Sequence, residues 1–135
     1  MILIDTSAMI EFLNCTDSRV GKMVEQLVRH DAANTAIADM TLTEILQGIK
    51  NDQEFTSIKN SLLAWNIISL RGTDSYVAAA ELYRACRKHG LSIRSTIDCL
   101  IAQIAIENNA EVLHNDRDFE SLSAICELKL CSLIS

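Results

Sequence analysis

Proline and glycine are nearly missing from this sequence, which has no proline and four glycines in 135 residues. Phosphate-cradling loops of the P-loop and dinucleotide-binding types need several glycines at fixed spacing. No such loop can be assembled from the four that are present, which are Gly21, Gly48, Gly72 and Gly90. Two large classes of nucleotide-binding protein are thereby excluded.

Aromatic residues are also scarce, at 4%, whereas hydrophobic residues as a whole make up 49%. Aliphatic side chains must therefore supply most of a hydrophobic core. The sequence shows no linker, internal repeat or low-complexity tract, and its length is that of one ordinary domain. We expect a single domain over residues 1–135.

Long apolar runs are absent, since none approaches the roughly 20 residues that a membrane-spanning helix needs. The N-terminus lacks the basic region of a signal peptide, and Asp5 and Glu11 interrupt its apolar stretch. The five cysteines are an odd number without a C-x-x-C pair, which argues against a disulfide framework or a zinc site. We expect a cytoplasmic protein, not associated with a membrane, with most cysteines in the core and Cys15 exposed.

Positive charge is in deficit, because 12 Lys and Arg face 18 Asp and Glu, for a formal net charge of −6. A protein that holds nucleic acid by a broad basic surface is therefore not expected. An enzyme that grips phosphates through bound metal ions is compatible with this charge, because the ions cancel several of the negative charges.

Short apolar segments alternate with longer stretches whose apolar residues recur at helical spacing. The expected strands are residues 2–4, 35–38, 66–70, 112–113 and 129–133. Apolar residues at helical spacing indicate helices at residues 8–13, 17–28, 42–49, 55–65, 76–86 and 97–105. Gly90 can end the fifth of these, and the sixth is expected to end near residues 108–109. Strands separated by helices imply a parallel sheet covered on both faces. We expect an α/β fold, a three-layer α/β/α domain with a central parallel sheet of four to five strands.

Four acids far apart in sequence are expected at one edge of this sheet. Asp5 directly follows the first strand, and Asp116 follows the strand at 112–113. We place Glu44 in the first turn of the helix after the second strand, and Asp98 in the first turn of the helix that leads into the strand at 112–113. In parallel sheets, ligands bind at this carboxyl edge.

Clustered carboxylates repel, by ~4 kcal/mol for two of them ~4 Å apart at an effective dielectric of about 20. Protonation or a bound cation relieves the repulsion. Carboxylates with water suit Mg²⁺ or Mn²⁺, which activate water and neutralise charge on a phosphodiester in its transition state. An acid cluster without histidine or cysteine ligands therefore points to phosphoryl chemistry rather than zinc hydrolysis.

Each acid also has a structural alternative. Asp5 could cap the first helix, and Asp116 and Asp118 lie where a turn would take Asp anyway. Glu44 could complete a capping box with Thr41, and Asp98 a similar pattern with Ser95. Independent caps have no reason to share one edge, so the set favours a site. Asp98 also borders an apolar stripe, which predicts partial shielding from water.

Four segments carry a resemblance to a known family: ILIDTSA (2–8), TEILQG (43–48), IRSTIDCLIA (93–102) and LHNDRDF (113–119). In this order, and spanning nearly the whole chain, they resemble the four motifs of the PIN-domain family, specifically the VapC-type ribonuclease toxins of bacterial type II toxin–antitoxin systems. The third segment is the most specific. One motif alone would be weak, whereas four in order are strong.

The resemblance implies a compact α/β fold with a central parallel sheet and a Mg²⁺- or Mn²⁺-dependent endoribonuclease activity. It assigns Asp5 and Asp98 as the principal metal ligands. Glu44 and Asp116 would complete the catalytic site, as direct ligands or through water. The implied reaction is hydrolysis, in which a metal-bound water attacks phosphorus and the metal stabilises charge on the phosphoryl oxygens. The number of ions, one or two, stays open.

Other residues would assist these acids. The resemblance makes Asp118 an accessory acid and Ser7 a hydroxyl that positions a ligand or water, and His114 stands where the family often has a threonine. Arg94 and Arg117 are candidates for guiding RNA phosphates, because the guanidinium group fits phosphate oxygens. The resemblance also implies a homodimer held inactive by a cognate VapB-type antitoxin, whose C-terminal segment lies across or near the acidic site.

Two other functions fit part of the pattern. A catalytically silent PIN domain would act only as a binding module, which the four intact acids oppose. A Mg²⁺-binding phospho-acceptor signalling domain would need paired acids after the first strand and a lysine after the last. Here Asp5 stands alone after its strand, and no such lysine is evident.

Overall fold

Within residues 1–132, the sheet has five short strands that all run parallel. The computed structural model describes residues 1–132, in which the strands are β1 (Ile2–Ile4), β2 (Thr35–Ala38), β3 (Ile67–Ile68), β4 (Glu111–Leu113) and β5 (Lys129–Leu130). Their order across the sheet is β3-β2-β1-β4-β5, so the first strand of the chain lies at the centre. The prediction of a parallel sheet with four to five strands is confirmed.

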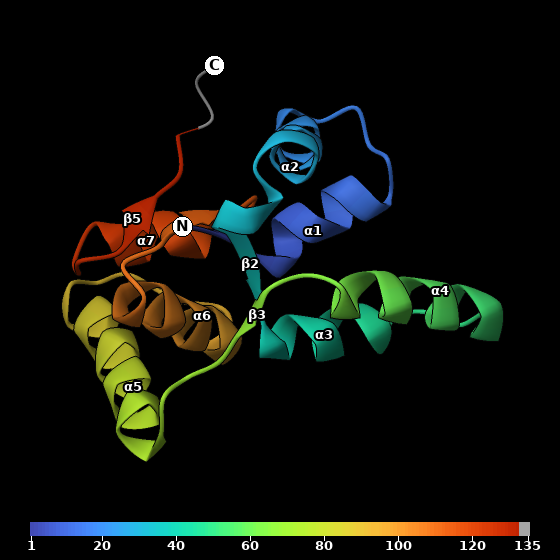
Figure 1. The fold of residues 1–135 in the computed structure, drawn as a ribbon. Helices are drawn as coiled ribbons and strands as arrows, with labels where there is room; N and C mark the ends of the chain where they lie inside the picture. The colour runs from blue at the N-terminus through green and yellow to red at the C-terminus, as the bar shows by residue number, and fades with distance from the viewer. Residues whose placement is uncertain (133–135) are drawn as a thin grey trace.

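Within residues 1–132, seven α-helices cover the two faces of the sheet (Figure 1). They are α1 (Thr6–Leu13), α2 (Arg19–His30), α3 (Asp39–Leu46), α4 (Asp52–Leu63), α5 (Thr73–Lys88), α6 (Thr96–Glu107) and α7 (Arg117–Ser123). One hydrophobic core joins α5, α6 and α7 to one face, and a second joins α1 to α4 to the other. The predicted three-layer α/β/α fold is confirmed. None of these helices has the length and hydrophobicity that a membrane span requires.

Consecutive residues of the central strands point into different cores. Leu3 and Val112 pack with α5, α6 and α7, whereas Ile4 and Leu113 pack on the opposite face with α1 to α4. All four side chains are fully buried, and burial of each contributes roughly 1.5–3 kcal/mol. Because both faces are covered, the strands read as continuous apolar runs rather than alternating ones.

Several elements differ from the expectations. The edge strand β3 covers Ile67–Ile68 rather than 66–70, because only these two residues pair with β2. The last strand was expected at 129–133; it covers Lys129–Leu130, and residue 133 lies outside the described residues. Helix α7 was not predicted from the sequence. It has seven residues and two buried apolar side chains, Phe119 and Leu122, which are too few for a recognisable helical pattern of apolar residues.

The carboxyl ends of the parallel strands meet at one edge of the sheet, and this edge positions the acids. Asp5 follows β1, α3 follows β2, and the segment 114–116 follows β4. Helix α6 leads into β4 and packs on the sheet, so its first turn lies at the same edge as the end of β4. The chain therefore returns to this edge four times with an acidic residue.

Candidate active site

Asp5 lies where β1 ends and α1 begins. Its carboxylate caps α1, because Oδ2 accepts hydrogen bonds from the backbone N–H of Ser7 at 3.0 Å and from the Ser7 hydroxyl at 2.6 Å. The Ser7 oxygen in turn accepts a hydrogen bond from the backbone N–H of Asn115 at 2.8 Å. The cap considered from the sequence is therefore present, and Ser7 holds one oxygen of Asp5 while tying α1 to the segment after β4.

Glu44 lies farther into its helix than the sequence indicates. Strand β2 continues directly into α3, which begins at Asp39, so the predicted first-turn position and the Thr41–Glu44 capping box are wrong. The Thr6 hydroxyl instead donates to Glu44 Oε1 at 2.6 Å and hydrogen-bonds with the Thr41 hydroxyl at 3.0 Å. Thr6 is the chain neighbour of Asp5, and this bond brings Glu44 close enough for its charge to act on Asp5.

Asp98 lies in the first turn of α6, as the sequence predicts. The residue is 7% exposed, and its Oδ2 atom is buried without a hydrogen-bond partner among the described residues. Ser95 takes the N-cap position of α6, but its side chain makes no capping hydrogen bond. Because an unpartnered buried carboxylate oxygen costs free energy, helix capping does not explain this residue.

Asp116 and Asp118 open helix α7 rather than a simple turn. Asp116 is the N-cap residue, and its Oδ1 accepts a hydrogen bond from the backbone N–H of Asp118 at 3.0 Å. One oxygen from each of Asp98, Asp116 and Asp118 lies within 4.8 Å of the other two. We call these three residues the three-aspartate cluster. Asp118 was expected only as an accessory acid. It is 3% exposed and contributes one of the three oxygens of the cluster.

Arg94, in the loop before α6, bonds two members of the cluster. Its Nη2 donates to Asp116 Oδ1 at 2.7 Å, its Nε to Asp118 Oδ1 at 3.4 Å, and its backbone N–H to Asp118 Oδ2 at 2.9 Å. Arg117 is exposed and, among the described residues, makes no ion pair with these acids. Within residues 1–132, the ion pairs of Asp116 and Asp118 are both with Arg94. His114 accepts the backbone N–H of Asp116 at Nδ1, 3.1 Å away, and burial lowers its pKa, so a neutral ring supports this loop.

Burial raises the pKa values of two of the acids. It raises the pKa of Asp5 to about 6, although hydrogen bonds from Ser7 act in the opposite direction. Burial, the neighbouring carboxyl group of Asp118 and the charges of the other acids raise the pKa of Asp98 to about 8. At neutral pH and without a cation, Asp98 therefore keeps its proton. A bound cation would favour the charged form of both residues.

The donors of the three-aspartate cluster fit a hard divalent cation. Among the described residues the cluster offers carboxylate oxygens, the ligands that Mg²⁺ and Mn²⁺ prefer, and no histidine or cysteine joins it. The unpartnered Oδ2 of Asp98 is a buried acceptor for which the protein supplies no donor. Asp5 is not one of the three, although its charge acts on Asp98. The charge of Glu44 acts on Asp5.

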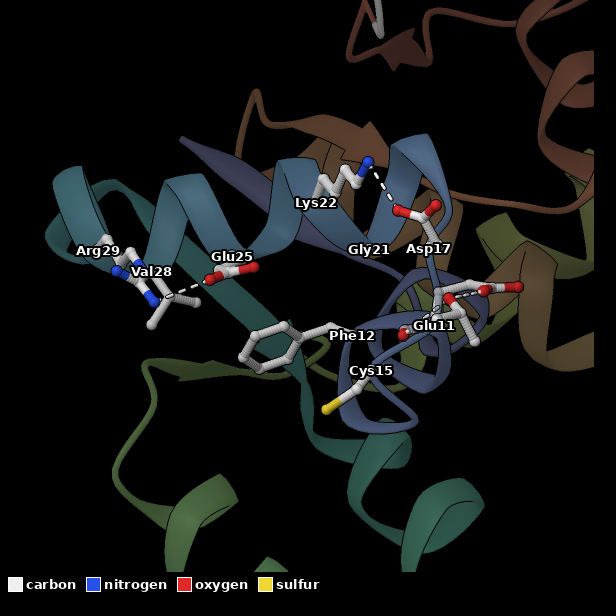
Figure 2. A pocket seen from close by; sticks show the side chains of 10 residues that line it. Glu11, Phe12, Cys15, Asp17, Gly21, Lys22, Glu25, Val28 and Arg29 are labelled. Atoms are coloured by element: carbon white, nitrogen blue, oxygen red, sulfur yellow. Dashed lines mark hydrogen bonds and ion pairs between the residues drawn. The ribbon is translucent and has the colours of Figure 1, made fainter.

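A hollow of about 480 Å³ lies away from these acids, between α1 and α2 (Figure 2). Four of its charged side chains form ion pairs, Lys22 with Asp17 at 2.7 Å and Arg29 with Glu25 at 2.9 Å. A fifth, Glu11, accepts hydrogen bonds from Thr16 and Asn115. The ring of Phe12 also lines it (Figure 2). Because each of these charged groups already has an ion-pair or hydrogen-bond partner, the hollow offers no group of free acids or bases for catalysis.

Sequence reasoning missed three residues that shape the site: Thr6, Thr41 and Asn115. Thr6 stands between Asp5 and Ser7 in the first motif, and this position could have indicated that its side chain lies at the site. Thr41 was interpreted as a helix cap. Asn115 acts through its backbone N–H, which no side-chain pattern reveals.

Comparison with known proteins identifies the family of this chain. A profile of the PIN domain family matches residues 2–125. Ribonuclease VapC11 of Mycobacterium tuberculosis is 36% identical over 132 residues, which cover 98% of each chain. Ribonuclease VapC17 of the same species is 29% identical over 106 residues, which cover 73% of this chain and 79% of that one.

Solved structures share the fold at lower identity. FitAcB from Neisseria gonorrhoeae superposes with a TM-score of 0.75 at 21% identity and covers 98% of each chain. VapBC-1 from nontypeable Haemophilus influenzae superposes with a TM-score of 0.72 at 20% identity and covers 100% of each chain. Since the family profile spans most of the sequence and the VapC11 match spans nearly all of it, this chain belongs to the PIN domain family and, within it, to the VapC proteins.

Proposed function

We propose that this protein is an endoribonuclease that requires Mg²⁺ or Mn²⁺, hydrolyses RNA phosphodiester bonds and serves as the toxin of a VapBC-type toxin–antitoxin pair. The observation that carries the proposal is the buried, unpartnered Oδ2 of Asp98 within the three-aspartate cluster. The 36% identity with a protein named Ribonuclease VapC11, over 98% of both chains, supports RNA as the substrate.

The acids divide the work of holding the cation. Asp5 and Asp98 are the proposed principal ligands, and Glu44 and Asp116 complete the site directly or through water. Asp118 is the proposed accessory acid, and its burial beside Asp98 makes it a candidate ligand as well. When bound, the cation lowers the pKa of a water and offsets negative charge on the phosphodiester. The carboxylates around it position that water and take up its proton.

Arg94 and Arg117 are the proposed contacts to RNA phosphates. The side chain of Arg94 is 59% exposed, so an incoming phosphate can reach its guanidinium group. Planar guanidinium groups bind phosphate oxygens in pairs. Because the chain carries a net charge of −6, attraction for RNA must come mainly from the cation and from these two arginines.

The proposal includes a partner and a location. Relatives of this chain carry the name VapC, and solved structures with its fold are described as VapBC complexes. By that likeness we include a cognate VapB-type antitoxin whose C-terminal segment covers or flanks the acidic edge. A homodimer, a cytoplasmic location and no membrane association are carried over from the family in the same way.

The test is cleavage of a mixed RNA pool in Mg²⁺, in Mn²⁺ and in a chelator, with the wild type, Asp98→Asn and Asp74→Asn. Asp74 is an exposed acid in the first turn of α5, so it matches the helix position of Asp98 without the site. We expect the wild type and Asp74→Asn to cut RNA in either metal, and Asp98→Asn to lose nearly all activity. Equal cleavage by all three would overturn the proposal, and no cleavage by any would favour a binding module.

A further inference from the structure

One carboxylate oxygen in the three-aspartate cluster already accepts as many hydrogen bonds as it has lone pairs. Asp116 Oδ1 accepts Arg94 Nη2 at 2.7 Å and the backbone N–H of Asp118 at 3.0 Å. A carboxylate oxygen has about two lone-pair sites. A cation that binds Asp116 through Oδ1 has to replace one of the two donors, and a cation on Oδ2 brings a second positive charge to a carboxylate that Arg94 already pairs.

We propose that the Arg94 side chain is an internal counter-ion that leaves Asp116 when a divalent cation binds, while the Arg94 backbone N–H keeps Asp118 in place. This inference rests on the metal site of the proposed function. The guanidinium group bridges Asp116 Oδ1 and Asp118 Oδ1, at 2.7 and 3.4 Å. These are two of the three acids that a cation in the cluster would bridge.

The two donors to Asp116 differ in how easily they move. The N–H of Asp118 is fixed by the first turn of α7, and its residue is 3% exposed. The Arg94 side chain is 59% exposed, and exposed ion pairs of this kind contribute little net free energy. The arginine side chain is thus the donor that yields. Its backbone N–H, 2.9 Å from Asp118 Oδ2, stays and preserves the position of that acid.

Release has a consequence for substrate binding. A guanidinium group that leaves Asp116 stays tethered at the edge of the cluster, with its donors free for a new anion. A phosphate oxygen is the anion that the proposed RNA substrate would bring. Arg94 would then exchange an acid of the protein for a phosphate of the RNA, which couples occupancy of the metal site to RNA binding.

Calorimetric titration with Mn²⁺, in the absence of RNA, tests the displacement. We expect Arg94→Ala to bind Mn²⁺ about two- to fivefold more tightly than the wild type, because no side chain has to be displaced. Arg117→Ala is the matched control, since Arg117 stands between Asp116 and Asp118 in the sequence and carries the same charge, but makes no ion pair with either acid among the described residues. Equal tightening in both variants would indicate charge alone and overturn the inference, as would weaker binding by Arg94→Ala.

A second measurement needs no variant. In the wild type, titration with Mg²⁺ should shift the Nε–H resonance of the Arg94 side chain while the neighbouring Arg94 backbone amide, bonded to Asp118, moves much less. An Nε–H resonance that stays unchanged at saturating Mg²⁺ would overturn the inference. Neither experiment contains RNA, so failure of RNA cleavage would sink the proposed function and leave this result standing.

Discussion

The two halves of the acidic site satisfy their carboxylates in different ways. In the half around Glu44, the Thr6 hydroxyl donates to the carboxylate at 2.6 Å and is itself bonded to the Thr41 hydroxyl. In the half formed by the three-aspartate cluster, Arg94 bonds Asp116 and Asp118.

The third acid of that cluster has no such arrangement, because Asp98 Oδ2 is buried and unpartnered among residues 1–132. In the Glu44 half, the carboxylate is hydrogen-bonded by the neutral hydroxyl group of the nearby Thr6. In the Asp98 half, one arginine pairs with two carboxylates, and Oδ2 of Asp98 accepts no hydrogen bond among the described residues. Under the proposed function, we therefore expect the cation to centre on the Asp98 half, with Glu44 in a supporting position.

The largest expected effect is on activity, where Asp118→Asn should cost more than Glu44→Gln. Asp118 is buried beside Asp98 and fixed by the Arg94 backbone N–H, so its loss disturbs the centre of the proposed metal site. We expect Asp118→Asn to lower kcat/KM for RNA cleavage about 10–100-fold, the range for residues that support a metal site, and Glu44→Gln to lower it less. Steady-state cleavage in Mg²⁺ measures both variants. A larger loss in Glu44→Gln would reverse the comparison.

The next effect is on the stability of the metal-free protein. The folded protein keeps a proton on Asp98 up to a pKa of about 8, and on Asp5 up to about 6, whereas the ordinary value is 3.8. The folded state therefore binds more protons than the unfolded state across this window, so stability falls as pH rises from about 4 to about 8. The loss is complete once the pH exceeds the folded pKa of Asp98.

Asp98→Asn removes the titrating group and should flatten this pH dependence. We expect the variant to be more stable than the wild type by roughly 1–3 kcal/mol above about pH 8 in a chelator, and similar to it at about pH 4. Urea denaturation at both pH values measures the difference. Adding Mn²⁺ should stabilise the wild type more than the variant. A variant that is less stable at high pH would contradict the account of Asp98.

The smallest effect is expected in the Glu44 half. Thr6→Val removes the hydroxyl that bonds Glu44 and Thr41, and one such bond contributes about 1 kcal/mol to the free energy of unfolding. RNA cleavage should fall less than in Asp118→Asn. Thr43→Val, at an exposed position of the same helix α3, is the control. If Thr6→Val abolished cleavage, the Glu44 half would be as central as the Asp98 half.

The fold and the edge that carries the acids could be predicted from the sequence, because both follow from local patterns. A continuous apolar run predicted β1, and the end of this strand predicted the position of Asp5. The position of Asp98 followed from the helix that leads back into the strand at 112–113. Glu44 was misplaced by one turn, since β2 passes into α3 without a capping side chain that would mark the boundary. Helix α7 was missed because its buried face is only two residues wide.

The contacts of Arg94 could not be predicted, although the residue itself was identified. Its bonds to Asp116 and Asp118 join loops more than 20 residues apart, with separations of 22 and 24. Such pairing depends on how α6 and α7 are packed, which periodicity does not encode. That Asp98 Oδ2 has no hydrogen-bond partner among the described residues likewise depends on packing. The burial of Asp98 could be predicted from its apolar neighbours in the sequence.

The most direct test of the central claim is to locate the cation. Crystals of the wild type and of Asp98→Asn, grown with Mn²⁺, should be compared by anomalous diffraction at the manganese edge. The account predicts a peak within coordination distance of Asp98, about 2.0–2.2 Å for a carboxylate oxygen on such an ion, and its loss or strong weakening in the variant. A peak of equal height in both crystals, or one remote from the three-aspartate cluster, would contradict it.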